Sequence, residues 1–239
     1  MTQRTTLRAA ESALLLVLVG CGSDLTLPSD SGIGLNLSRV DGDSQRGTVG
    51  APLPAPLVVR VAASGNTAVA GRRVVFSPVG EGAAVRLDPD TARTDSRGTA
   101  SSIWVLGTEA GQHQVQAHLV ADDVAPAPVT FSAEAIAGPP DTLAGASALN
   151  RAGRQGHELS GPLVVRVADR FGNSVPGATV AWAVTTGDGE LSAETTRTGS
   201  DGTASVTWEL GDRVGVQKAA ASIPGVIGSP VNFTATVLF

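Results

Sequence analysis

Acidic residues are the side chains of this sequence that could bind a metal ion. Asp122 and Asp123 are adjacent in one loop, and Glu134 and Asp141 follow near the middle of the chain. Calcium takes about six to eight oxygen ligands, which carboxylates gathered at a domain junction can supply. The acidic spacing of a helix–loop–helix calcium site is absent, however. Turn residues in contact with solvent explain these acids better, so we expect no metal ion and no other cofactor.

The histidines do not form a catalytic or metal-binding pattern either. His113 and His118 are five residues apart on one expected strand, so their side chains face opposite sides, and His157 lies in the other half of the chain. No Gly-x-Ser-x-Gly turn and no Gly-Lys-Ser/Thr sequence is present, which removes the usual signs of a serine nucleophile or a phosphate cradle. We therefore expect that the protein is not an enzyme.

The single cysteine follows an N-terminal sequence that is typical of an export signal. Arg4 and Arg8 precede a short apolar run at residues 13–19, and Cys21 comes directly after it. This run is far shorter than the roughly twenty residues that cross a bilayer, and its charged and apolar order is typical of an export signal.

The residues around Cys21 resemble the lipobox of bacterial lipoproteins. The matching residues are Leu18, Val19, Gly20 and Cys21. The resemblance implies that residues 1–20 are a signal peptide cleaved before Cys21, whose thiol then carries a covalent lipid. Gly22 stands where an Asp would favour retention in the inner membrane. We expect an exported protein that is lipid-anchored to the cell envelope, in the outer membrane rather than the inner one.

Composition narrows the range of partners. The chain has 239 residues with a net charge of −5, its basic residues are spread along the chain, and aromatic residues make up 3% with no Tyr. A nucleic-acid partner would need a basic surface or aromatic platforms for base stacking, and neither is present. The partners that remain are the membrane, through the lipid, and a protein or glycan that the sequence does not identify. We expect a monomer.

An internal repeat sets the domain organisation. Residues 56–62, Pro-Leu-Val-Val-Arg-Val-Ala, recur unchanged as residues 162–168, at an offset of 106. Residues 98–101, Gly-Thr-Ala-Ser, recur as residues 202–205 at an offset of 104. One unit of about a hundred residues therefore occurs twice. The predicted domains are residues 32–137 and 142–239, joined by a Gly-Pro-Pro-Asp linker at 138–141 and preceded by a tether at 21–31.

Apolar residues alternate with polar ones inside each unit, which indicates strands. Leu163, Val165 and Val167 share one face while Arg166 points the other way. Several such rows with turn residues between them predict a β-sandwich of about seven strands in each unit. The expected core residues are Val165, Val167, Val180, Trp182, Val206, Trp208, Phe76 and Trp104.

The strand around Trp104 has apolar residues at its outward positions. Ile103 and Val105 stand where the second unit has Thr207 and Glu209. Exposed apolar residues on a sheet can mark a contact surface, although a loop packed over the face would also explain them. We expect the loop.

Two segments of the second unit resemble bacterial Ig-like repeats of the invasin and intimin type. They are residues 169–182, Asp-Arg-Phe-Gly-Asn-Ser-Val-Pro-Gly-Ala-Thr-Val-Ala-Trp, and residues 198–204, Thr-Gly-Ser-Asp-Gly-Thr-Ala. The family usually has an Asp where this chain has Ala63 and Gly199. The resemblance implies a fold class of two tandem immunoglobulin-like β-sandwiches, which follow a cleaved lipoprotein signal peptide.

Two functions fit this organisation. The first is a non-catalytic cell-envelope lipoprotein whose tandem Ig-like domains act as a surface spacer or as a stalk for adhesion and interaction. The alternative is a carbohydrate-binding or envelope-assembly module with an Ig-like fold. Sugar binding needs aromatic residues on an open face, whereas the Trp residues of this chain fall in inward rows. This pattern favours the stalk.

Overall fold

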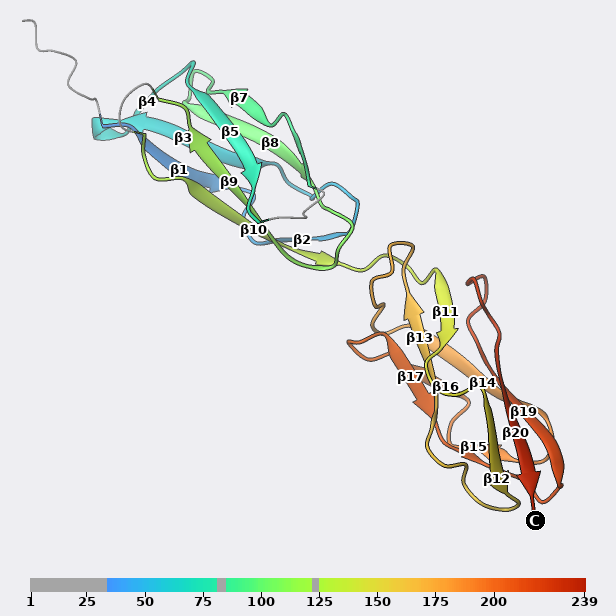
Figure 1. Cartoon of the computed structure of the whole chain (residues 1–239). Helices are drawn as coiled ribbons and strands as arrows, with labels where there is room; N and C mark the ends of the chain where they lie inside the picture. Colours follow the sequence, from blue (N-terminus) through green and yellow to red (C-terminus); the bar gives the residue numbers. More distant parts are fainter. Residues whose placement is uncertain (1–33, 81–84, 122–124) are drawn as a thin grey trace, which may run out of the picture. The chain divides into compact units, whose positions relative to one another are not determined.

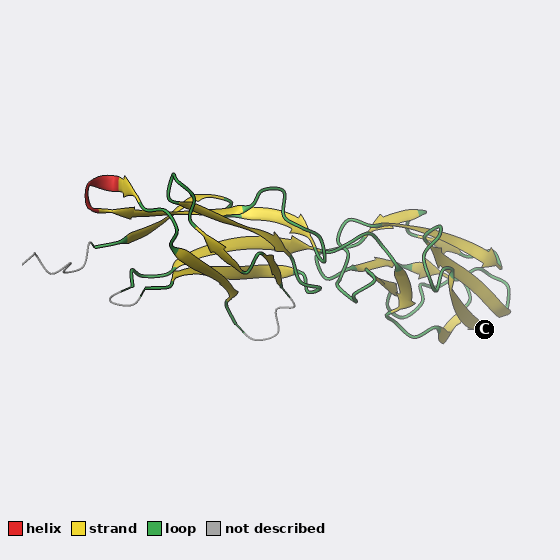
Figure 2. Cartoon of the chain, turned by 90° about the horizontal axis from the view of Figure 1, so that it is seen from above, coloured by secondary structure: helices red, strands yellow, loops and turns green. Residues whose placement is uncertain are grey.

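The computed structural model describes residues 34–80, 85–121 and 125–239, so the expected signal peptide and tether lie outside it. Within these residues the chain forms two β-sandwiches, which confirms the all-β prediction (Figure 1). The one helical segment of the described residues is a single 3-10 turn at Ser64–Asn66, drawn red in Figure 2. No helix in this part of the chain is both long and apolar enough to span a membrane.

The first sandwich consists of two facing sheets. One sheet has the order β1 (Asn36–Asp41), β3 (Leu57–Ala63), β8 (Thr99–Val105) and β6 (Arg86–Asp88), with β4 (Thr67–Ala68) paired to β3. The other has the order β2 (Gln45–Thr48), β10 (Val129–Ile136), β9 (Gly111–Leu119), β5 (Arg73–Pro78) and β7 (Thr91–Arg93). The last strand, β10, lies inside its sheet, parallel to β2 and antiparallel to β9.

The second sandwich repeats this topology. One layer contains β11 (Thr142–Gly145), β13 (Leu163–Ala168) and β17 (Thr203–Val206), together with the pair β15 (Glu190–Leu191) and β18 (Trp208–Glu209). The other layer has the order β12 (Asn150–Arg154), β20 (Val231–Leu238), β19 (Gly215–Ser222), β14 (Thr179–Thr186) and β16 (Thr195–Arg197). Strands β17 and β18 together take the place of β8, so the repeat in sequence is also a repeat in strand order.

In the described ranges, each unit divides into ten strands, some of them only two or three residues long, rather than about seven. The break between β17 and β18 shows one reason. It lies at Thr207, whose N–H donates to the hydroxyl of Ser192 at 3.0 Å instead of to a strand backbone. The Ser192 N–H in turn donates to the Thr207 carbonyl at 3.1 Å. A side chain that replaces a ladder hydrogen bond in this way cannot be read from the apolar pattern.

Alternate side chains of the strands fill the space between the two sheets of each sandwich. Leu163, Val165 and Val167 on β13 are fully buried, whereas Arg166 is exposed. All eight expected core residues are at most 4% exposed: Val165, Val167, Val180, Trp182, Val206, Trp208, Phe76 and Trp104. In the second sandwich the ring centroids of Trp182 and Phe233 lie 6.2 Å apart, within the range at which aromatic pairs interact.

The outward face of β8 is open, and the expectation that a loop covers it is wrong. Ile103 is 50% exposed, and Ser101 on the same face is exposed too. Strand β8 pairs with Leu57 to Arg60 of β3 on one edge and with Arg86 to Asp88 of β6 on part of the other. The exposure of Ile103 shows that no described segment covers the face of the strand at this position.

Candidate functional site

Most of the residues with expected chemistry fall outside the described part of the chain. They are Leu18, Val19, Gly20, Cys21, Asp122 and Asp123. The described residues that remain of the acidic group are Glu134 and Asp141, and each has its own partners. Glu134 is exposed on β10, with its Oε2 atom 3.4 Å from Nε of Arg46. Asp141 is half-buried, and its backbone pairs with Ala168 and Ile227.

Neither carboxylates nor histidines of the described residues form a metal site. No group of three or more His, Cys, Asp or Glu residues in this part of the chain is placed to hold an ion. His113 donates from Nε2 to the carbonyl of Glu109 at 2.8 Å, and His157 donates from Nδ1 to the carbonyl of Gln155 at 2.8 Å. Each of these two rings is therefore held by a backbone carbonyl close to it in sequence.

The three tryptophans belong to the cores and offer no surface to a sugar. Trp104 and Trp208, which occupy equivalent positions in the two units, are both 0% exposed. Their indole N–H groups have no hydrogen-bond partner among the described residues. Trp182 differs, because its indole N–H donates to Oγ1 of Thr196 at 2.8 Å. The burial of these rings argues against a carbohydrate platform built on them.

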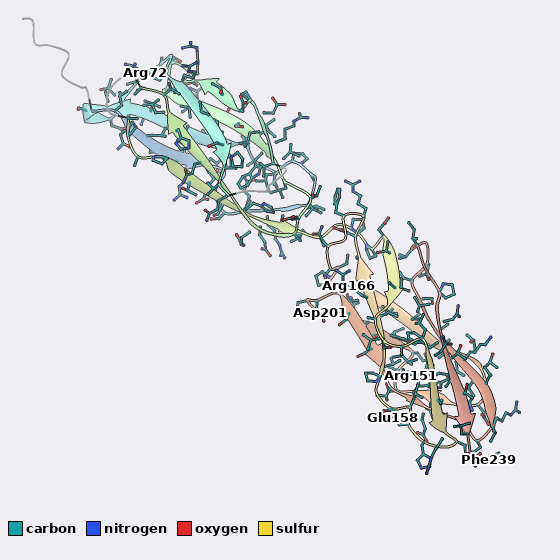
Figure 3. The ribbon with its side chains drawn as sticks, in the orientation of Figure 1. Arg72, Arg151, Glu158, Arg166, Asp201 and Phe239 are labelled. Atoms are coloured by element: carbon teal, nitrogen blue, oxygen red, sulfur yellow. The ribbon has the colours of Figure 1, made fainter. Side chains whose placement is uncertain are left out.

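Figure 3 labels two arginines of the second sandwich whose guanidinium groups donate hydrogen bonds to loop carbonyls of the same sandwich. Arg151 donates to the carbonyls of Ser160 and Gly161 at 3.0 and 2.9 Å. Burial lowers the pKa of the Arg151 guanidinium. Arg166 donates to the carbonyl of Gly172 at 3.1 Å in the loop that follows its strand. Both guanidinium groups close turns of the same sandwich.

The loop after β13 is organised by the carboxylate of Asp169, which is 2% exposed. Its Oδ1 atom accepts the N–H groups of Phe171 and Asn173, both at 2.9 Å. Its Oδ2 atom accepts the N–H of Gly138 at 2.8 Å and the side-chain amide of Asn173 at 2.9 Å. Burial raises the pKa of Asp169, but the hydrogen bonds that Asn173, Gly138 and Phe171 donate outweigh it and leave the pKa below its ordinary value.

The two units use different aspartates in the turn that precedes β8 and β17. In the first unit, Oδ1 of Asp95 accepts the N–H groups of Arg97 and Thr99 at 2.9 and 2.8 Å. Gly199 stands at the equivalent place in the second unit, where Asp201 instead accepts the N–H of Thr203 at 3.0 Å. Hydrogen bonds from Thr99 and Thr203 lower the pKa of Asp95 and of Asp201, respectively.

A groove of about 590 Å³ opens at the edge of the second sandwich. Its lining residues are 181–184, 189–191 and 193–195, so β14 forms one wall and the β15 segment with the chain after it forms the other. The charged residues of this lining are Glu190 and Glu194, both exposed. Among the described residues, this groove combines a free strand edge with charge of a single sign.

Strand β14 is longer than its partner on this edge. Its pairing with β16 ends at Ala181, opposite Thr195, and one further bond runs from the Trp182 N–H to the Glu194 carbonyl at 2.8 Å. On its other side β14 continues to pair with β19 as far as Thr186. The part of β14 beyond Trp182 thus has a strand on one side and the groove on the other.

Comparison with known proteins bears on the fold of this chain. Residues 160–236 match the family model of the bacterial Ig-like domain (group 1). No curated protein matches the sequence. Among solved structures, the D00–D0 domains of intimin are similar with 14% identity and a TM-score of 0.42, covering 86% of this chain and 100% of that one.

Two further solved structures are similar at the same low level of identity. The Escherichia coli adhesin FdeC is 15% identical with a TM-score of 0.48, and the match covers 86% of this chain and 64% of that one. InvD of Yersinia pseudotuberculosis is 17% identical with a TM-score of 0.48, and the match covers 85% of this chain and 57% of that one.

The family match falls on the unit in which the sequence resemblance is strongest. It contains residues 169–182 and 198–204 in full, which fold into the Asp169 loop, the start of β14 and the turn before β17. The prediction of an Ig-like repeat is confirmed for this unit. Over residues 160–236, the chain is similar to the bacterial Ig-like domain of group 1.

Proposed function

We propose that the protein is a non-catalytic, lipid-anchored lipoprotein of the cell envelope whose two Ig-like sandwiches act as a spacer or as an adhesion stalk. The observation that carries the proposal is the repeated strand order of two sandwiches, each with its own closed apolar core. The group 1 match of the second unit supports it. Such units leave loops and strand edges as the surfaces for a partner.

The anchor is proposed from the sequence around Cys21. Cleavage before Cys21 and modification of its thiol would attach the tether at 21–31 to the membrane. Several acyl chains make such attachment effectively permanent, because each buried methylene contributes about 0.8 kcal/mol. Metabolic labelling with an alkyne fatty acid tests this proposal. We expect label on the wild-type chain and none on Cys21→Ser, and label on both chains would contradict it.

An adhesion assay on whole cells tests the stalk, with two variants that separate anchoring from location. Cys21→Ser releases the protein from the membrane, and Gly22→Asp keeps the lipid while directing the protein to the inner membrane. The proposal expects adhesion with the wild type and its loss with both variants. Wild-type cells that adhere no better than cells without the protein would count against it.

The carbohydrate-binding alternative receives no support from the tryptophans. Trp104, Trp182 and Trp208 are at most 4% exposed, so none of them can stack on a sugar ring without unfolding its sandwich. A glycan array probed with the purified chain distinguishes the two functions. We expect no bound glycan, and a specific glycan would restore the alternative.

A further inference from the structure

The open edge of β14 presents unpaired backbone groups. In a β-strand, successive residues direct their N–H and C=O groups to opposite sides. The Trp182 N–H points toward β16, since it donates to the Glu194 carbonyl. Val184, two residues on, therefore directs its N–H and C=O to the same side, where β16 has already ended. Val184 lies opposite Ala219 on β19, in register with Trp182 and Ala183, and the register shifts only after it, before Thr186.

The groove along this edge has room for one more strand segment. Its volume is about 590 Å³, and Val184 and Ala183 line one side of it. The opposite wall carries Leu191, which is half-buried, and Ala193. An extended segment placed here would pair with Val184 through its backbone and direct alternate side chains into the groove and out of it.

The charge around the groove selects the chemistry of that segment. Glu190 lines the groove and stands opposite Glu209 in the pairing of β15 with β18. Glu158, labelled in Figure 3, is paired with Glu209 through an isolated antiparallel backbone bridge. Three exposed carboxylates thus lie side by side across neighbouring segments, an arrangement that is unfavourable by itself and that cationic side chains would relieve.

At the equivalent positions, the first sandwich has neither the free strand N–H nor the acidic side chain. At an offset of 106, Pro78 stands where the second unit has Val184, and a proline has no N–H to offer at a strand edge. At an offset of 104, Arg86 stands where the second unit has Glu190, and it forms an ion pair with Asp88 at 3.0 Å. Proline and basic residues at an edge are devices that prevent strand addition. The second unit has neither device on β14.

We propose that the β14 edge of the second sandwich binds an extended peptide with basic side chains, which adds to the sheet as a strand beside Val184. This inference deepens the proposed function, because it names the chemistry of a partner for the stalk. The backbone of Val184 supplies the pairing, and Glu190 and Glu194 supply the preference for positive charge.

Binding of a synthetic hexapeptide of alternating Val and Lys to the full chain in detergent tests the proposal. We expect saturable binding that weakens as salt is added, and at least about tenfold weaker binding of a hexapeptide of alternating Val and Glu. Val184→Pro should weaken binding of the Lys peptide about tenfold, since it removes the N–H that pairs with the peptide. Val184→Ala, which keeps the N–H, should bind as the wild type does. Glu190→Arg should weaken the Lys peptide and strengthen the Glu peptide.

Val184→Pro and Glu190→Arg each introduce into the second unit the residue that the first unit has at the equivalent position. Thermal melting checks that each variant remains folded. If Val184→Pro does not fold, Glu190→Arg alone decides, because its site is exposed. Equal binding by the wild type and the folded variants overturns the proposal, as does the absence of peptide binding. Self-association that Val184→Pro abolishes would overturn it in favour of a second copy of this chain. Because the assay needs neither cells nor the lipid, its failure leaves the adhesion test of the stalk standing.

Discussion

The N–H of Gly138 donates to the carboxylate of Asp169 at 2.8 Å, across 31 residues of sequence. The same carboxylate accepts three further groups from Phe171 and Asn173. One buried side chain thus fixes the loop after β13 and the chain segment that leads into β11. The first unit has Ala63 at the equivalent position and forms the 3-10 turn Ser64–Asn66 in its place.

Removal of the Asp169 carboxylate should destabilise the second sandwich. We expect Asp169→Ala to lower its free energy of unfolding by about 2 kcal/mol, because several backbone donors lose a charged acceptor. Denaturant unfolding followed by tryptophan fluorescence measures this. Ala63→Ser, at the equivalent position of the first unit, is the control and should change stability little. Equal stability of Asp169→Ala and the wild type would contradict the role of the loop.

The lowered pKa of Asp169 predicts an acid-sensitive contribution to stability. Since the folded-state pKa lies below the unfolded one, the contribution is fully present above the ordinary pKa of an aspartate, about 4. It is lost as the pH falls further, through the lowered folded-state pKa. Unfolding free energies measured from pH 6 down to about pH 2 should decline less steeply for Asp169→Asn than for the wild type. Parallel curves for the two proteins would show that another group is responsible.

The indole N–H groups make the tryptophans of the second sandwich unequal. Trp208→Phe removes an N–H that has no partner among the described residues, whereas Trp182→Phe removes one that donates to Thr196. Both variants lose ring volume in a packed core. We expect Trp182→Phe to cost about 1 kcal/mol more than Trp208→Phe in the free energy of unfolding. Urea titrations of the two variants measure the difference, and the reverse order would be inconsistent with the hydrogen bond.

The open face of β8 should accept a charge. Ile103 is 50% exposed, so we expect Ile103→Lys to change the free energy of unfolding by no more than about 0.5 kcal/mol. Ala100→Lys, at a position 4% exposed on the same strand, is the matched control and should unfold the first sandwich. Circular dichroism melts of both variants decide. Unfolding by Ile103→Lys would mean that the face is covered after all.

The turn before β17 should be destabilised when only one of its residues is replaced by the equivalent residue of the first unit. A side chain at Gly199 would meet Oδ1 of Asp201 at 3.1 Å, so Gly199→Asp places two carboxylates together. We expect Gly199→Asp to lower the melting temperature. The double variant Gly199→Asp/Asp201→Arg, which reproduces Asp95 and Arg97 of the first unit, should recover it. A melting temperature that the second substitution does not improve would argue against this repulsion.

The apolar pattern was sufficient for the fold class but not for the exposed surfaces. Alternation identified inward rows such as Val165 with Val167, because burial of a sheet face acts on every second residue. The exposure of Ile103 was predicted wrongly, since it depends on which loops cross a face. The alternation does not indicate the groove at β14, because the groove arises where β16 stops pairing, which depends on how two strands meet rather than on the pattern within one strand. The contrast between Pro78 and Val184 at an offset of 106 is the signal that could have revealed it.

The inside position of β10 and β20 has a consequence for the order in which the two units fold. Each sandwich places its C-terminal strand between an early strand and the preceding one, as β20 lies between β12 and β19. Neither unit can complete its sheet before its own final residues have been synthesised. The first unit contains all of its described strands by Ile136 and can fold while the second is still being made. Synthesis from the N-terminus therefore lets two units of the same strand order fold one after the other, which limits exchange of strands between them.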